Sequence, residues 1–189
     1  GRLGVLGLLA TLLVWIGCDG QTGEHGATRQ RPTSTARPGG LDLSIRVLLD
    51  DELANCDIAV PGLFDLLDAD QRTPLLENVS ISRMTVRFGP GAIVFPELQQ
   101  FFEMEAVEIV PHGEEPVSVG IGDDRREYRG TFTVCRDPDR SGAVVNTLDV
   151  EEYLISVVAS EAPATFHPEA LRAQAIVSRT YAWYQKRTA

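Results

Sequence analysis

The chain of 189 residues has little lysine, cysteine and histidine, and each shortage narrows what the protein can be. Lys186 is the only lysine and the formal net charge is −10, whereas a nucleic-acid-binding surface needs a basic footprint. We therefore expect no nucleic acid among its partners. No P-loop, GxGxxG, HExxH or CxxC motif occurs, and His25, His112 and His167 are isolated, so we expect no cofactor and no metal site.

The sequence has one long apolar run, residues 3–16, which is uncharged but too short to span a bilayer comfortably. Arg2 precedes the run and Gly17-Cys18 follows it, an arrangement typical of a secretory signal. Gly17-Cys18 also resembles the cleavage box of bacterial lipoproteins, although Trp15 stands where that box usually has leucine. We expect residues 1–18 to be a lipoprotein-type signal with Cys18 lipidated, and ordinary secretion is the alternative. Either way the predicted location is the cell envelope, outside the cytoplasm.

Residues 19–40 are rich in glycine, threonine, proline and arginine and show no apolar period, which predicts a disordered tether. From residue 41 the sequence becomes globular. Apolar residues alternate with polar ones over 43–49, as in a half-buried strand, and similar runs occur at 79–88, 92–95, 104–110, 116–120, 127–134 and 142–147. Residues 58–77 are ambiguous, with a short helix over 61–67 as one interpretation. A β-rich region followed by two helices predicts an α+β fold.

The end of the sequence carries clear helix signals. Asp149 is a candidate N-cap, and Glu152 three residues later completes the spacing of a capping box. Pro163 ends this helix, and Pro168 begins a second one at a position where a missing N–H costs nothing. Glu161 is thereby placed in a short loop between the helices.

Glu161 is the candidate acid/base. The dipole of the preceding helix disfavours a carboxylate at its C-terminus, which favours the protonated acid that a general acid needs. The alternative from the residues alone is a solvated loop glutamate. On the second helix Gln174, Ser178 and Tyr181 follow one another at helical spacing and line one face. They either line a site or are satisfied interior polar groups, and Arg179 either serves Glu161 or forms an ion pair with Glu169 or another acid.

Residues 127–184 resemble the SpoIID/LytB family, which comprises the stage II sporulation protein D type and the amidase enhancers. The resemblance rests on an ordered series of residues at fixed spacing. The series is Tyr128-Arg129-Gly130, Asn146, Val150-Glu151-Glu152-Tyr153-Leu154, Val157-Val158, Ser160-Glu161, Pro163, Glu169-Ala170-Leu171, Ala173-Gln174-Ala175 and Arg179-Thr180-Tyr181-Ala182. The family domain normally continues beyond this series, so we expect residues 41–189 to hold an incomplete domain. Some members bind zinc through that later part.

The resemblance implies an activity and roles. The sporulation member is a lytic transglycosylase of peptidoglycan glycan strands whose catalytic glutamate lies in a Glu-Met-Pro motif. Glu161 is the matching residue, with Ala162 in place of Met, and Arg179 matches an arginine important for activity. Gln174, Ser178 and Tyr181 are then expected to bind substrate. The enhancer branch implies the alternative, a non-catalytic wall-binding module that stimulates a separate amidase. Expected partners are thus glycan strands, an amidase in the alternative, and the membrane through a lipid anchor.

Two cysteines remain once Cys18 is assigned to the lipobox. Cys56 and Cys135 are the possible internal pair, and a disulfide between them is plausible in an extracytoplasmic compartment. Two buried thiols are the alternative.

Overall fold

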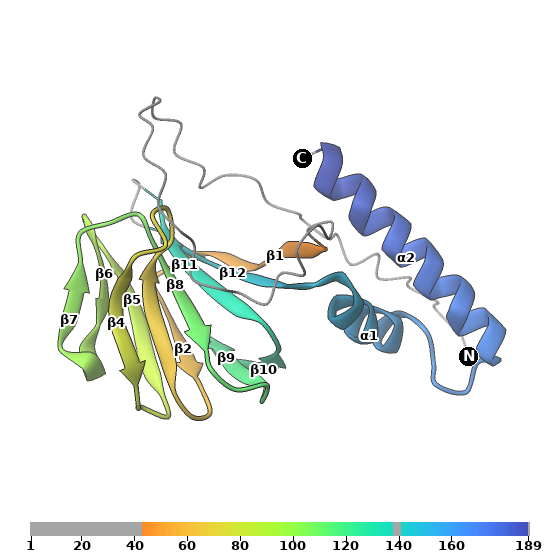
Figure 1. The fold of residues 1–189 in the computed structure, drawn as a ribbon, viewed down its shortest axis with the longest axis horizontal. Helices are drawn as coiled ribbons and strands as arrows, with labels where there is room; N and C mark the ends of the chain where they lie inside the picture. The colour runs from red at the N-terminus through yellow and green to blue at the C-terminus, as the bar shows by residue number, and fades with distance from the viewer. Residues whose placement is uncertain (1–42, 138–140, 189) are drawn as a thin grey trace, which may run out of the picture.

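The computed structural model describes residues 43–137 and 141–188. These residues form two six-stranded sheets followed by two helices, so the predicted α+β class is confirmed (Figure 1). The predicted signal, the lipidation of Cys18 and the tether all fall in residues 1–42 and lie outside the described residues. In the part of the chain that is described, no helix is both long and apolar enough to cross a membrane.

Both sheets are antiparallel throughout. The first, sheet A, has the strand order β1 (Ser44–Leu53), β12 (Gly142–Asp149), β11 (Thr131–Arg136), β8 (Ala106–Pro111), β3 (Phe64–Asp68) and β4 (Pro74–Val79). The second, sheet B, has the order β10 (Asp124–Tyr128), β9 (Val117–Ile121), β2 (Asn55–Ala59), β5 (Met84–Gly89), β6 (Ala92–Phe95) and β7 (Gln100–Phe102). A 3₁₀ turn, Pro96–Leu98, joins β6 to β7.

The two sheets pack face to face around one apolar core. Alternate residues of each strand point inward, because successive side chains of a strand lie on opposite faces. Phe132 and Val134 of β11 therefore join the core, while Cys135 joins a small separate cluster with Ala106. Other fully buried core residues are Ile58, Phe64, Leu66, Val86, Ile93, Phe95, Val107, Ile109, Val117 and Val144.

The helix considered for residues 61–67 is wrong. Phe64–Asp68 is strand β3, paired with β8 on one side and β4 on the other. Phe64 and Leu66 are fully buried in the core, which is the alternation of a strand. The apolar spacing of this short segment fits a helix as well, and the neighbouring strands decide between the two.

A tight connection between β10 and β11 explains two residues of the sequence motif. Gly130 has φ +99°, and a Cβ there would lie 2.2 Å from the backbone oxygen of Thr147, so no other residue fits. Asn146, 2% exposed, donates from Nδ2 to the backbone oxygens of Arg129 (2.8 Å) and Thr131 (3.2 Å). Both residues therefore shape the scaffold beside the helices.

The helices α1 (Val150–Glu161) and α2 (Pro168–Thr188) form a hairpin that extends from one side of the sandwich (Figure 1). A second apolar cluster anchors it, with Ile45 of β1 packed among Val150, Tyr153 and Leu154 of α1 and Ala182 of α2. Burying a leucine-sized side chain stabilises by roughly 1.5–3 kcal/mol. The amine of Lys186 adds a hydrogen bond of 2.7 Å to the backbone oxygen of Ser44.

Candidate active site

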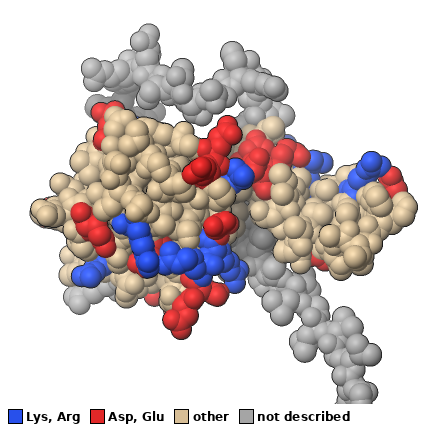
Figure 2. Space-filling model, turned by 90° about the horizontal axis from the view of Figure 1, so that it is seen from below, with Lys and Arg blue, Asp and Glu red and all other residues tan. Residues whose placement is uncertain are grey.

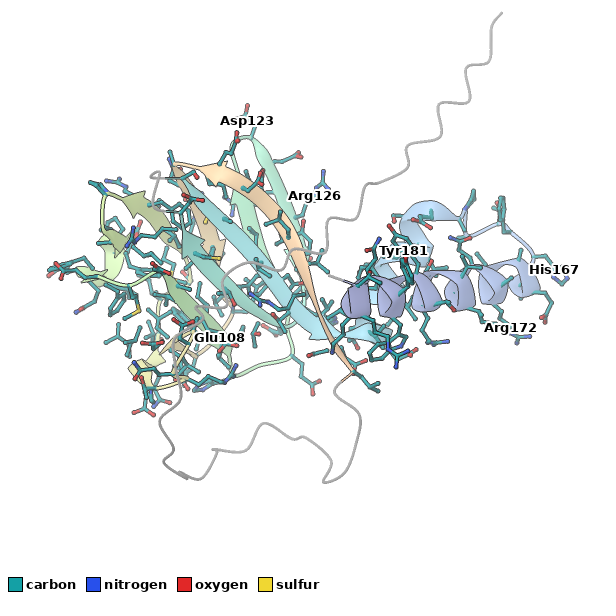
Figure 3. The ribbon with its side chains drawn as sticks, turned by 90° about the horizontal axis from the view of Figure 1, so that it is seen from above. Glu108, Asp123, Arg126, His167, Arg172 and Tyr181 are labelled. Atoms are coloured by element: carbon teal, nitrogen blue, oxygen red, sulfur yellow. The ribbon has the colours of Figure 1, made fainter. Side chains whose placement is uncertain are left out.

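The hairpin is built by the signals that the sequence shows. Asp149 is extended (φ −65°, ψ 145°), and its carboxylate accepts from the backbone N–H of Glu151 at 2.8 Å, which confirms the N-cap. Glu161 is the last residue of α1, not a loop residue as predicted, since the helix continues up to its C-cap, Ala162, directly before Pro163. His167 precedes Pro168, accepts from the N–H of Glu169 at 3.3 Å, and lies at the tip of the hairpin (Figure 3).

The carboxylate of Glu161 meets the polar face of α2. Nε2 of Gln174 donates to Oε2 of Glu161 and makes a longer contact of 3.5 Å with Oγ of Ser178. Glu161 is exposed, Gln174 is half-buried, and Ser178 is 7% exposed. The structure thus brings together three of the predicted site residues, in a line that runs from the surface into the helix interface.

Each of the other glutamates of the hairpin is paired with an arginine. Glu151 is held by Arg179, and Glu169 by Arg172 one turn further along α2. Glu152 lies 3.7 Å from Nε of Arg129, which ties the β10–β11 connection to the start of α1. The side chain of Glu152 is thus engaged with Arg129, where the sequence predicted a capping box with Asp149.

Arg179 does not contact Glu161. Its Nε donates to Oε1 of Glu151 at 2.9 Å and its Nη2 donates to Oε2 at 2.5 Å, so the guanidinium grips both oxygens of that carboxylate. The hydrogen bonds from Arg179 lower the pKa of Glu151, and the same bonds raise the pKa of Arg179. Of the two roles considered for Arg179, the structure shows the ion pair, with Glu151 as the acid.

Tyr153 was assigned only to the buried stripe of α1, yet its hydroxyl belongs to the polar site. Burial, and then the charges of Glu161 and Tyr181, raise the pKa of Tyr153 to about 12. Tyr181 comes from α2, where its hydroxyl accepts from Nε2 of Gln185 at 2.6 Å (Figure 3). The sequence signal was the spacing of Tyr153, Val157 and Glu161 at four-residue intervals, which places all three on one helix face.

A second surface of the hairpin is apolar. A groove of about 470 Å³ runs between α1 and α2, and the Glu151–Arg179 ion pair forms part of its wall. The rest of the lining is Leu154, Ile155, Val158, Ala159, Ala162, Ala164, Leu171 and Ala175. Glu161 is not part of this lining. The face of the hairpin seen in Figure 2 is correspondingly poor in charged side chains.

The remaining predicted residues lie in the sandwich. Cys56 on β2 and Cys135 on β11 are both buried, in different sheets and different apolar clusters, and no disulfide joins them. Burial raises the pKa of the Cys56 thiol to about 12. Among the described residues, no group of three His, Cys, Asp or Glu side chains could hold a metal ion. His112 is structural, since its Nε2 lies 2.9 Å from Asp65.

The fold and site define a β-sandwich with a helical hairpin, on which one glutamate, Glu161, is paired with a neutral amide and not with an arginine. Residues 139–189 match the family model described as SpoIID, stage II sporulation protein. Two curated proteins are similar over 37 residues, both called stage II sporulation protein D: 62% identical in Bacillus subtilis (strain 168) and 57% in Bacillus amyloliquefaciens. Over this short part of the chain, which includes the hairpin, the matches support the SpoIID family.

The matched stretch is 20% of this chain and 11% of each of those two relatives, so the chain corresponds to about a tenth of their length. The family model begins at residue 139, after the Tyr128-Arg129-Gly130 part of the motif. No solved structure matches the chain.

Proposed function

We propose that the protein is a peptidoglycan lytic transglycosylase in which Glu161 acts first as general acid and then as general base. The bond cleaved joins N-acetylmuramic acid to N-acetylglucosamine. The proposal combines the geometry of the hairpin with the family to which this segment belongs.

One observation carries it: of the four glutamates on the two helices, Glu161 is the one whose contact in the described structure is a neutral amide. A guanidinium partner stabilises the ionised carboxylate and opposes protonation. A general acid must begin its cycle protonated, and an amide N–H can donate to either protonation state. Glu151, Glu152 and Glu169 are each paired with an arginine and suit structural roles.

The chemistry needs a single carboxyl group. Protonated Glu161 gives its proton to the glycosidic oxygen as the bond from muramyl C1 to that oxygen breaks. The resulting carboxylate then takes the proton of the muramyl C6 hydroxyl while that oxygen bonds to C1, giving a 1,6-anhydro end. No water is consumed and Glu161 ends protonated, as it began. A hydrolase would need a second carboxylate flanking the bond.

The test uses the full-length protein and glycan strands freed of stem peptides, with anhydromuramyl ends measured by mass spectrometry. Glu161→Gln should lower the rate at least about 100-fold, the usual contribution of general acid–base catalysis. Glu169→Gln is the matched control on the same hairpin and should stay close to wild type. Equal rates for wild type and Glu161→Gln, or no anhydromuramyl product from wild type, would reject the proposal.

A second candidate is a non-catalytic wall-binding module that stimulates a separate amidase. The apolar groove favours it, because a groove lined by aliphatic side chains suits a protein partner better than a sugar. The discriminating result is faster cleavage by an added cell-wall amidase, equal for wild type and Glu161→Gln, without anhydromuramyl product. Ile155→Asp tests the groove in the same amidase experiment, because Ile155 lines the groove and is 67% exposed.

A further inference from the structure

Gln174 stands between an exposed carboxylate and a buried hydroxyl. Its Nε2 contacts Oε2 of Glu161 on α1 and, at 3.5 Å, Oγ of Ser178 one turn along α2. A carboxylate only accepts hydrogen bonds, so the side-chain amide must turn its nitrogen toward Glu161. The orientation of the amide is therefore fixed by its neighbours.

We propose that Gln174 is a positioning residue for Glu161, with Ser178 holding Gln174 through its amide nitrogen. Anchoring Oε2 leaves Oε1 of Glu161 as the oxygen that gives and takes the proton. The effect of Gln174 on catalysis rests on the proposed function. The positioning of Glu161 by Gln174 rests on the contacts alone.

The donor count of Gln174 argues against the predicted substrate-binding role. A side-chain amide nitrogen carries two N–H groups, and Glu161 and Ser178 account for both. No N–H of this amide is left to donate to a sugar hydroxyl. Ser178 itself is buried in the helix interface, beyond the reach of a glycan strand.

The same contact suits both halves of the proton cycle. When Glu161 is ionised, Oε2 accepts from the amide as a carboxylate oxygen. When Glu161 is protonated on Oε1, Oε2 still accepts as a carbonyl oxygen. The carboxyl group can therefore change protonation without changing its position, which keeps the acid and base steps in one geometry.

Two hydroxyl groups complete the surroundings of Glu161. Tyr153 lies on the same side of α1, and burial and then the charges of Glu161 and Tyr181 raise its pKa to about 12. Tyr181 lies on α2, where its hydroxyl accepts from Gln185. Gln174 is thus the group through which α2 acts on the carboxylate directly.

The main variant is Gln174→Met, which keeps the length of the side chain and removes the donor. The matched control is Gln185→Met on the same helix, which removes an amide that serves Tyr181 instead. For Gln174→Met we expect kcat to fall about 10- to 100-fold with KM little changed, since misplacement of a reacting group by about 1 Å costs rate on this scale.

Carboxyl ¹³C NMR of glutamate-labelled protein measures positioning without any activity. The Glu161 resonance is assigned by its loss in Glu161→Gln. Its chemical shift should change in Gln174→Met and, by less, in Ser178→Ala, because the contact with Oε2 is lost or loosened, and should stay at the wild-type value in Gln185→Met. Ser178→Ala removes one oxygen only, so it tests the inference even where Gln174→Met unfolds.

Two results would overturn the inference. One is a Glu161 carboxyl chemical shift that is unchanged in both Gln174→Met and Ser178→Ala. The other is a raised KM with kcat retained in Gln174→Met, which would make the amide a substrate contact. A protein without transglycosylase activity but with the changed chemical shift would refute the proposed function and leave the positioning contact standing, so the two failures are distinguishable.

Discussion

Arg179 of α2 reaches across the hairpin to Glu151 in the first turn of α1 and binds both of its carboxylate oxygens, with Nε at 2.9 Å from Oε1. This pairing joins the start of one helix to the middle of the other. It also keeps the guanidinium away from Glu161, whose contact is the neutral amide of Gln174. A neutral partner is what the proposed role of Glu161 as a general acid requires. Arg179 therefore serves the site through Glu151 and the shape of the hairpin.

The first prediction concerns the salt dependence of this pair. Both partners are exposed, so their attraction is screened by dissolved ions. Glu151→Gln should lower Tm slightly at low salt, and the difference from wild type should shrink at high salt. Arg179→Lys should have a smaller effect than Glu151→Gln, because lysine keeps the charge and loses only the binding of two oxygens in one plane. A Tm difference that is independent of salt would contradict the assignment.

The second prediction concerns Tyr153. Its pKa of about 12 arises first from burial and then from Glu161 and Tyr181. Ultraviolet titration should show one tyrosine that ionises last, and Tyr153→Phe should remove that component. Glu161→Gln should lower the pKa of Tyr153, since a negative neighbour is lost. An identical titration in Glu161→Gln would mean that the two groups do not lie together.

The third prediction concerns Asp57 on the outer face of sheet B. The side-chain hydrogen bond from Arg83 lowers the pKa of Asp57 below its ordinary value of 3.8, with further lowering by Thr85 and by Arg125, which is 3.3 Å away. Lysine and arginine side chains gather in a band over the sandwich in Figure 2, and all of those on the strands are arginines, since Lys186 lies on α2.

Because the folded pKa of Asp57 is depressed, its stabilising effect is present above the ordinary value and is lost as pH falls through the folded pKa. Asp57→Asn should thus cost about 1 kcal/mol in free energy of unfolding at neutral pH and progressively less below pH 3.8. Urea unfolding at several pH values measures this. Asp123→Asn, at the exposed turn labelled in Figure 3, is the control and should show no such trend.

The fourth prediction compares two glycines. A Cβ on Gly142 would lie 2.0 Å from the ring of Phe88 inside the core, whereas a Cβ on Gly120 would lie 2.9 Å from the mobile end of Arg125. Gly142→Ala should therefore destabilise by about 1–3 kcal/mol, as overpacking does. Gly120→Ala should be nearly neutral, because Arg125 can move and alanine reduces the entropy of the unfolded chain. Denaturant midpoints that rank the two variants in the opposite order would refute this packing.

Local signals predicted the hairpin and most of the strand positions, but not how the strands pair. Asp149, Pro163 and Pro168 act on their own backbone, so their sequence positions alone locate the helix ends. The pairing of β1 with β12 joins the first and last strands, about 100 residues apart, and no local pattern records it. The ambiguity of residues 61–67 has the same origin, since β8 and β4 make that segment a strand.

The candidate site also has a part that local spacing predicts and a part that depends on how distant segments pack. Helical spacing placed Gln174, Ser178 and Tyr181 on one face, and the structure keeps them there. Which side chain each would meet depended on how α2 crosses α1, and a sequence does not give that crossing. Arg179 therefore pairs with Glu151 where Glu161 or Glu169 had been the named candidates, and Gln174 takes the place beside the carboxylate.

Strand β12 ends at Asp149 and α1 begins at Val150, without a linker between them. A helix of 12 residues is about 18 Å long and nearly rigid, so α1 extends from the sheet as a stiff rod with Glu161 at the end far from β12. A rotation of a few degrees at β12 displaces the carboxylate by about 1 Å. A bend at this edge of sheet A, where β12 pairs with β1, would therefore move the carboxylate proposed as the acid/base group.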